Sequence, residues 1–288
     1  MLTALVSVPF STEGVDPSFD QHIICPSGTE DPPRECWKHS LGHLNHVSVG
    51  PAGVWGANRD DNIYHLSGTY QNAAAFGNAW SPVLGYLVQL EVGSDNVWGV
   101  NSLNEIYHRL GITSSSPTGS GWTQMDSGFV WISVSPRGSV WAVNVSGQLC
   151  HRRDSSNALP TGTAWDVMAN DMQQVDAGQA GVWALDNAGL LYYRHGTYGD
   201  DGSTGTEWRA VEGRRFSSIS SGRDLVVAVN SEGEVWLRTG LGPDTPAGLA
   251  WLRLAGKMDQ VDIYQSGTVV ALWGVDFNDQ IYFSTLLD

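Results

Sequence analysis

Residues 97–122 read VWGVNSLNEIYHRLGITSSSPTGSGW, and 43 residues further on residues 140–165 read VWAVNVSGQLCHRRDSSNALPTGTAW. Each stretch ends on a tryptophan that recurs along nearly the whole chain, at Trp37, Trp80, Trp122, Trp165, Trp208 and Trp251. The intervals between these tryptophans are 43, 42, 43, 43 and 43 residues. A fixed period of about 20–50 residues indicates one supersecondary unit copied in tandem. The chain therefore holds six copies of one unit.

Four short segments recur in each copy with the patterns of β-strands. The first begins at the tryptophan. The second alternates apolar with small or polar residues, as in VSVG at 47–50, which is typical of a strand with one inner face. The third and fourth, such as VWGVN at 97–101 and IYHR at 106–109, are apolar on both faces, which indicates strands buried on both sides.

Four antiparallel strands in each of six copies predict an all-β, six-bladed β-propeller. A solenoid is the competing architecture, but its end copies should differ from the others and carry polar caps. The first and last copies keep the apolar pattern of the rest, which favours a closed ring. We expect one domain over residues 1–288, with an N-terminal segment at 1–36 and the repeats at 37–288. We expect Leu2–Val8 to pair with the last blade and so cover an exposed edge.

Composition excludes several classes of function. Fifteen basic and thirty acidic residues give a net charge of −15, which repels phosphate backbones, so no nucleic-acid partner is expected. No apolar run approaches the roughly 18 residues of a membrane span. The start, MLTALVSVPFSTEG, has no basic residue before its apolar part and makes a poor secretory signal. Cys25 and Cys36 either form a bridge or stay as thiols, while Cys150 takes the place of an aromatic residue in other copies and is expected in the core.

The combined pattern, from the leading tryptophan through VSVG, VWGVN and IYHR to PxGxxW, resembles the tectonin repeat over residues 37–288. That resemblance implies a six-bladed propeller. It also implies a secreted, non-catalytic, multivalent lectin of innate immunity, similar to fish-egg lectins and horseshoe-crab plasma lectins. Such proteins bind glycans of microbial or cell surfaces, including lipopolysaccharide. Larger relatives use the repeat in protein-interaction scaffolds, which is the alternative function. Val226 and Val227 in the fifth copy, and extra residues before Trp273 in the sixth, depart from the pattern.

Polar residues at fixed positions are the candidate carbohydrate ligands. An Asn or Asp ends the third segment, where it either bonds the turn backbone or grips sugar hydroxyls: Asn58, Asn101, Asn144, Asp186, Asn230 and Asp276. The fourth segment carries His65, His108 and His151, then Arg109, Arg152, Arg194 and Arg238. These either bond between blades and to the following loop or contact a sugar. Loop residues Tyr70 and Tyr198 are expected to stack on a sugar ring.

Catalysis and cofactors have weaker signals. Glu91, Asp176 and Asp262 are expected to face the central channel, which would suit a glycoside hydrolase. The Asp-box of six-bladed sialidases, Ser-x-Asp-x-Gly-x-Thr-Trp, does not occur, and Asp200-Asp201-Gly202 has the wrong spacing. We therefore predict no enzyme and no cofactor. The oxygen-rich residues 58–62 could hold Ca²⁺, although they lack the EF-hand loop pattern.

Overall fold

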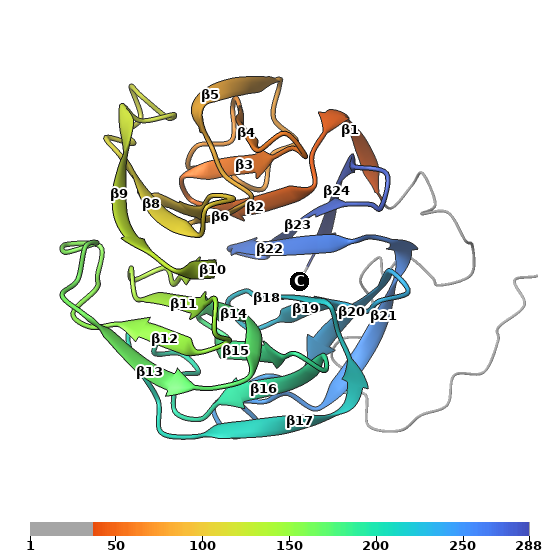
Figure 1. Cartoon of the computed structure of the whole chain (residues 1–288). Helices are drawn as coiled ribbons and strands as arrows, with labels where there is room; N and C mark the ends of the chain where they lie inside the picture. Colours follow the sequence, from red (N-terminus) through yellow and green to blue (C-terminus); the bar gives the residue numbers. More distant parts are fainter. Residues whose placement is uncertain (1–36, 288) are drawn as a thin grey trace, which may run out of the picture.

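The six copies form six four-stranded antiparallel sheets around a central axis, as Figure 1 shows. The computed structural model describes residues 37–287, and between these residues it contains β-strands and no helix. The prediction of an all-β, six-bladed propeller is confirmed.

In blades 1 to 5 the strands run outward from the axis in chain order. Blade 1 consists of β2 (His46–Gly50), β3 (Gly53–Ala57), β4 (Asn62–Leu66) and β5 (Trp80–Tyr86). Blade 2 consists of β6 (Gln89–Val92), β7 (Val97–Val100), β8 (Glu105–Leu110) and β9 (Gly121–Ser127). Blade 3 consists of β10 (Phe129–Val134), β11 (Val140–Asn144), β12 (Leu149–Arg152) and β13 (Trp165–Ala169). Blade 4 consists of β14 (Met172–Gly178), β15 (Gly181–Asp186), β16 (Leu190–Arg194) and β17 (Trp208–Arg215). Blade 5 consists of β18 (Ser218–Ser221), β19 (Val226–Val229), β20 (Glu234–Thr239) and β21 (Ala250–Lys257).

Blade 6 joins the two ends of the described chain. It consists of β22 (Gln260–Ser266), β23 (Val269–Val275), β24 (Gln280–Leu287) and, on the outside, β1 (Lys38–His43). Lys38 pairs with Phe283 and Ser40 with Ile281, so the ring is closed and the solenoid is excluded. The strand that opens each sequence copy at its tryptophan is thus the outermost strand of one blade, and the other three strands of that copy belong to the next blade. The pairing predicted for Leu2–Val8 lies outside the described residues.

The core lies between blades rather than within them. Buried apolar side chains form six clusters, each shared by two neighbouring blades. The largest members are the fully buried indoles of the third segment: Trp55, Trp98, Trp141, Trp183 and Trp273. In blade 5 Val227 takes the corresponding place and is fully buried. Cys150 packs in the same way between blades 2 and 3, as predicted, and burial raises the pKa of its thiol.

Close approach of the inner strands explains the glycine that ends VSVG and its equivalents. A Cβ atom on Gly50 would lie 2.4 Å from the carbonyl oxygen of Val92 in the next blade. On Gly178 it would lie 1.9 Å from the carbonyl oxygen of Ser221. Both distances are far below contact, so these positions need a residue without a side chain. These glycines lie at the turns between the first and second strands of each blade. The long loops before each outer strand lie on the same face of the ring as these turns, and we call this face the loop face.

Candidate functional site

Around the axis, the inner strands carry a serine in blades 1, 3 and 5 and a carboxylate in blades 2, 4 and 6: Ser48, Glu91, Ser133, Asp176, Ser220 and Asp262. Each serine Oγ accepts an N–H bond from the next blade, at 3.0 Å from Val92, 3.0 Å from Ala177 and 3.2 Å from Ile263. Asp262 Oδ2 accepts the Val49 N–H at 2.6 Å and so links blade 6 to blade 1. The alternating residues form a hydrogen-bonded belt.

A second layer of the axis consists of glutamines in blades 2, 4 and 6. Gln89 Oε1 accepts the Ile132 N–H at 3.0 Å, and its Nε2 donates to the Ile132 carbonyl at 2.9 Å. Gln260 binds Val47 in the same way, and Gln174 binds Ile219. At the same level His46 and Trp131, from blades that are not neighbours, approach to 5.7 Å between ring centroids. Paired amides and rings therefore fill the axis on the side away from the loop face.

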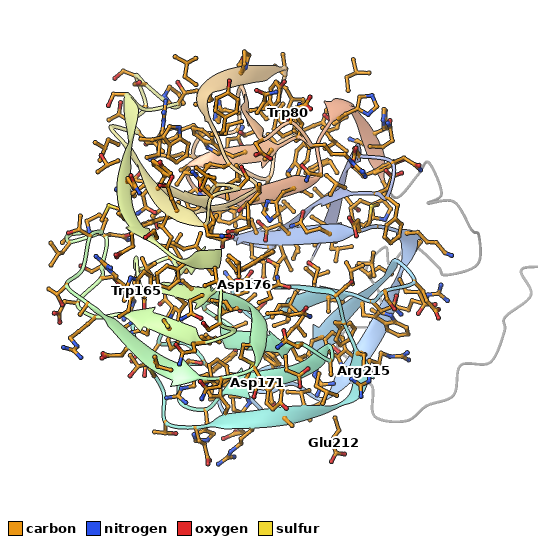
Figure 2. All side chains as sticks on the ribbon, viewed as in Figure 1. Trp80, Trp165, Asp171, Asp176, Glu212 and Arg215 are labelled. Carbon is orange, nitrogen blue, oxygen red and sulfur yellow. The ribbon has the colours of Figure 1, made fainter. Side chains whose placement is uncertain are left out.

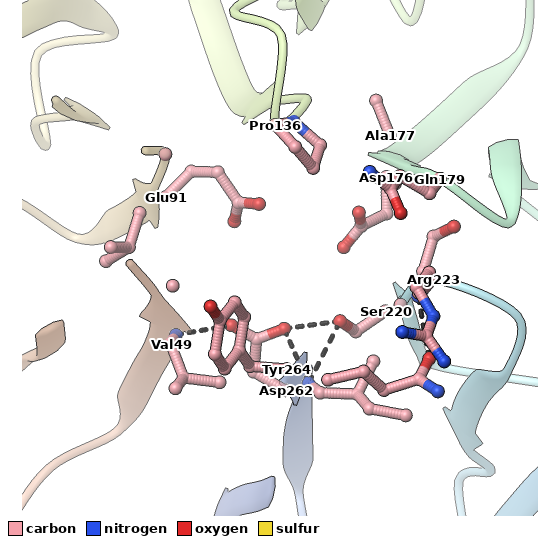
Figure 3. Close-up of a pocket in the computed structure, with 18 of the residues that line it drawn as sticks. Val49, Glu91, Pro136, Asp176, Ala177, Gln179, Ser220, Arg223, Asp262 and Tyr264 are labelled. Carbon is pink, nitrogen blue, oxygen red and sulfur yellow. Dashed lines mark hydrogen bonds between the residues drawn. The ribbon is translucent and has the colours of Figure 1, made fainter. Parts of the chain in front are cut away.

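A pocket of about 260 Å³ opens at the loop-face end of the axis. Glu91, Asp176 and Asp262 line it, together with Arg223 and Tyr264 (Figure 3), so the predicted placement of the three carboxylates in the channel is confirmed. Desolvation and mutual repulsion raise the pKa values of Glu91 and Asp176, and desolvation raises that of Asp262. Because these carboxylates bond the belt, they have a structural task that needs no ligand.

The Asn and Asp residues at the end of the third segment of each copy, which is the second strand of each sheet, cap the turns that follow. Asn101 Oδ1 accepts the N–H groups of Leu103 and Glu105 at 3.0 and 2.9 Å. The side-chain oxygens of Asn58, Asn144, Asp186, Asn230 and Asp276 accept the equivalent pairs of bonds. These turns lie opposite the loop face. In the stretch 58–62, Arg59 forms an ion pair with Asp279.

The repeated histidines are buried against the core tryptophans. His65, His108 and His151 lie 5.0, 4.6 and 4.7 Å from Trp55, Trp98 and Trp141, measured between ring centroids. Burial lowers the pKa values of His65 and His108 to about 4. His151 Nε2 bonds Ser139 Oγ at 3.0 Å. All three histidines pack within the molecule.

The repeated arginines bond the loop that follows them, as predicted. Arg109 Nε donates to the Thr118 carbonyl at 2.7 Å, and its guanidinium carbon lies 5.0 Å from the centroid of the Trp122 ring. Arg152, Arg194 and Arg238 make the same two contacts with their own loops and with Trp165, Trp208 and Trp251. Nη atoms of Arg109 carry no further bond within residues 37–287 and face the rim of the ring.

A groove lies at this rim, between the outer strands of blades 1 and 2. The groove between blades 1 and 2 encloses about 430 Å³ and is lined by Pro82–Gly85, Arg109, Thr118 and Ser120–Trp122. Leu84 is 92% exposed, so its side chain projects from the groove wall into solvent. A groove in which an arginine lies over a tryptophan ring and keeps Nη donors available can bind a polar ligand.

The equivalent places at the other blade junctions differ at the arginine and at the residue four places after each tryptophan. Between blades 6 and 1, Leu66 stands at the position of the arginine, and Leu41 stands at the position that Leu84 has between blades 1 and 2. Between blades 2 and 3, Asp126 binds Arg152 and accepts the Trp165 indole N–H at 2.9 Å. Four of the remaining leading tryptophans also donate to the preceding outer strand: Trp37, Trp80, Trp122 and Trp208. Among the six leading tryptophans, Trp251 is the one whose Nε1 has no partner within residues 37–287, as is also true of the core indoles Trp98, Trp141, Trp236 and Trp273.

The two loop tyrosines lie on the loop face, in blades 1 and 4. Tyr70 Oη bonds Asp95 of blade 2 at 3.4 Å. Tyr198 is partly buried, and its backbone N–H donates to Tyr193 Oη at 3.1 Å. In the loop that follows, the carboxylate of Asp201 accepts the backbone N–H of Arg137 in blade 3 at 2.8 Å. The structure therefore separates the predicted site residues into turn caps, core rings, loop-face tyrosines and rim arginines.

Sequence reasoning missed the position on the neighbouring outer strand from which Asp126 contacts Arg152. Leu84, Asp126 and Glu212 stand at one position of the repeat, four residues after the tryptophan, and differ in charge. That variation in an otherwise regular repeat was the available signal. No helix that could cross a membrane occurs between residues 37 and 287, and the same range holds no cluster of three metal-binding side chains.

The chain matches the family model of the tectonin domain over residues 12–131 and 126–269. The chain belongs to the tectonin family. This tectonin is similar to the perivitellin-2 31 kDa subunit of Pomacea maculata, with 37% identity over 114 residues. That match covers 40% of this chain and 38% of the relative, so it spans well under two thirds of the relative's length.

Two solved structures share the fold of this tectonin. The PQQ-bound aldose sugar dehydrogenase of Streptomyces coelicolor gives a TM-score of 0.55 at 11% identity, over 89% of this chain and 99% of that chain. A chain of the mitotic checkpoint complex gives 0.53 at 10% identity, over 98% and 100%. At such identities the likeness shows the fold alone.

Proposed function

We propose that this tectonin is a secreted, non-catalytic lectin that binds glycans of microbial or cell surfaces at several rim grooves. The observation that carries the proposal is the open groove between blades 1 and 2, where Arg109 covers the Trp122 ring and keeps Nη donors available. An aromatic face suits the C–H side of a sugar, and the guanidinium suits its hydroxyls. Lipopolysaccharide is one such surface glycan.

Repetition of the arginine–tryptophan pair supports a multivalent mode. The pair recurs where blade 4 meets blade 3 and where blade 5 meets blade 4. A single shallow sugar site typically gives millimolar affinity, about −4 kcal/mol. Several sites on one rigid ring raise the avidity for a repetitive surface by roughly 10² to 10⁴.

A glycan array followed by titration of the best ligand tests the function. Leu84→Trp places a larger side chain on the wall of the groove between blades 1 and 2, at an exposed position where no core contact is removed. We expect one site to be lost and the avidity for a multivalent glycan to fall. Leu41→Trp is the matched control, because Leu41 is 82% exposed at the same repeat position, in a groove without the arginine. No bound glycan on the array, or equal effects of the two variants, would reject the proposal.

A second candidate function is that of a subunit in a protein assembly. The Pomacea maculata relative is named as a subunit. The turns opposite the loop face expose Leu103, Val145 and Phe277 at 74, 58 and 51%. An array without any bound glycan, together with a partner lost on Leu103→Asp, would favour this function instead.

A further inference from the structure

The four repeated arginines of the rim differ in the bonds that their Nη atoms make. In three of them an Nη atom has a partner within the protein: Arg152 pairs with Asp126, and Arg194 and Arg238 donate to the carbonyls of Gly205 and Gly248 at 3.5 and 3.2 Å. Arg109 is the exception, because its bond from Nε to the Thr118 carbonyl is the one hydrogen bond that this side chain makes within residues 37–287. Its Nη donors therefore have no protein acceptor in that range.

Arg109 lines the groove of about 430 Å³ between blades 1 and 2. The residue is only 7% exposed, and burial lowers the pKa of its guanidinium. A charged group that is held out of water needs acceptors for its donors, because its burial otherwise costs free energy. Since the groove opens to solvent at the rim, a ligand can bring such an acceptor to the Nη atoms.

The next blade junction shows which acceptor suits an arginine at this place. The guanidinium carbon lies 5.0 Å from the centroid of the tryptophan ring at both junctions, and beside Arg152 the acceptor is the carboxylate of Asp126. Glu212 stands at the position of Asp126 in blade 4, but it is exposed and points away from the ring in Figure 2. Leu84 stands at that position beside Arg109, and no acidic residue among residues 37–287 lines the groove. The carboxylate is therefore left for a ligand to supply.

We propose that the groove between blades 1 and 2 binds the carboxylate of an acidic sugar, such as a uronic acid, through the Nη atoms of Arg109. The sugar class rests on the proposed lectin function, whereas the carboxylate rests on the contacts of Arg109 and Arg152. A guanidinium presents its donors in a planar fork that fits the two oxygens of a carboxylate. Thr118 and Ser120 line the groove beside it and carry hydroxyl groups that suit the hydroxyls of a sugar. The net charge of −15 disfavours polyanions and favours a ligand with one carboxylate.

The test uses the full chain, with methyl β-glucuronide as the probe and methyl β-glucoside as its neutral counterpart. Each is titrated while the indole N–H resonance of Trp122, which lines the groove, is followed in a ¹H–¹⁵N spectrum and assigned with Trp122→Phe. We expect the glucuronide to bind about tenfold more tightly or better, as a bond to a charged group allows. Equal affinities would reject the carboxylate and leave the lectin function standing.

Two exposed leucines give a matched pair of variants that leave the core intact. Leu84→Glu places a carboxylate on the groove wall, where it competes for Arg109 or repels the ligand, and it should weaken glucuronide binding about tenfold or more. Leu41→Glu adds the same charge at the same repeat position, next to Leu66 in place of an arginine, and should leave the affinity unchanged. Equal effects of the two variants would show that the glucuronide does not bind in this groove.

The arginine itself is tested in the same way. Arg109→Gln should weaken glucuronide binding about tenfold or more and leave glucoside binding nearly unchanged. Arg238→Gln is the control, because Arg238 makes the same loop contact and its Nη2 already bonds Gly248. Binding of the glucuronide to Arg109→Gln as to the wild type would overturn the proposal.

Competing anions and the glycan array separate the two proposals. Acetate that binds as tightly as the glucuronide would overturn the sugar class, and inorganic sulfate that does so would overturn the choice of a carboxylate. A positive array without any response to the glucuronide would reject this site while the lectin function stands. An array without bound glycan, together with equal binding of acetate and glucuronide, would reject the lectin function.

Discussion

Asp262 at the axis and Trp251 at the rim are eleven residues apart in one copy, and they differ in whether their polar groups are hydrogen-bonded. Asp262 accepts bonds from Val49 and Ser220, and every carboxylate of the axis contributes to the belt that joins blades. Trp251 keeps a buried N–H without an acceptor within residues 37–287. The axis uses its polar groups to close the ring, whereas at the rim some polar groups have no partner within residues 37–287. The contacts that join the blades therefore lie at the axis, and the proposed recognition belongs to the rim.

The largest effect is expected from the core beside the axis. Trp98→Ala removes an indole that is only 1% exposed between blades 2 and 3, and we expect a loss of about 3–5 kcal/mol in the free energy of unfolding. Leu103→Ala, exposed in the same blade, should change it by less than about 0.5 kcal/mol. Denaturant unfolding followed by tryptophan fluorescence measures both. Similar values for the two variants would contradict the division between core and surface.

Acid should also destabilise the axis. Burial lowers the pKa of His46 from 6.5 to about 4, so the unfolded chain binds more protons between these pH values. This residue then contributes about 3 kcal/mol of stability at pH 7 that is lost as the pH falls from 6.5 to 4. In His46→Leu the fall in melting temperature over this range should be smaller, while the exposed His39→Asn should behave as the wild type. His65 and His108 act in the same direction, so part of the acid sensitivity remains.

At the rim, Asp126→Ala should cost about 1–3 kcal/mol, because it leaves the nearly buried Arg152 and the Trp165 N–H without their acceptor. Glu212→Ala, at the same repeat position, should cost less than about 0.5 kcal/mol since its side chain is solvated. Thermal melts of the two variants measure the difference. Equal costs would show that Asp126 contributes nothing to closing its groove.

The smallest effect is a gain. Burial raises the pKa of Glu91 in the folded protein, so folding favours the protonated form of this side chain. The free energy of unfolding therefore falls as the pH rises through the folded pKa and the carboxyl group ionises. Glu91→Gln should raise the melting temperature slightly at neutral pH and remove part of this loss. Melts at pH 5 and pH 8 compare the variant with the wild type. A lower melting temperature at pH 8 would mean that the ionised carboxylate is needed in the belt.

Much of the fold followed from the repeat alone. The period of the tryptophans predicted six copies, and the apolar third and fourth segments predicted strands buried between blades. Both results follow from local pattern, because a side chain that faces the core must be apolar in every copy. The repeat did not predict at which strand each sheet begins. Whether the tryptophan strand opens one blade or ends the previous one depends on which edge pairs, and that is decided where β1 meets β24.

The candidate site divides in the same way. The sequence by itself determined which positions repeat, and it correctly assigned Arg109 and its equivalents to the following loops. Only the tertiary structure showed that one of these arginines, Arg109, lines a groove. Asp126 and Glu212 occupy the same place in the repeat, but a difference in strand register turns one carboxylate toward Arg152 and Trp165 and the other into solvent. Register depends on pairing between strands, and a repeat read along one chain does not contain it.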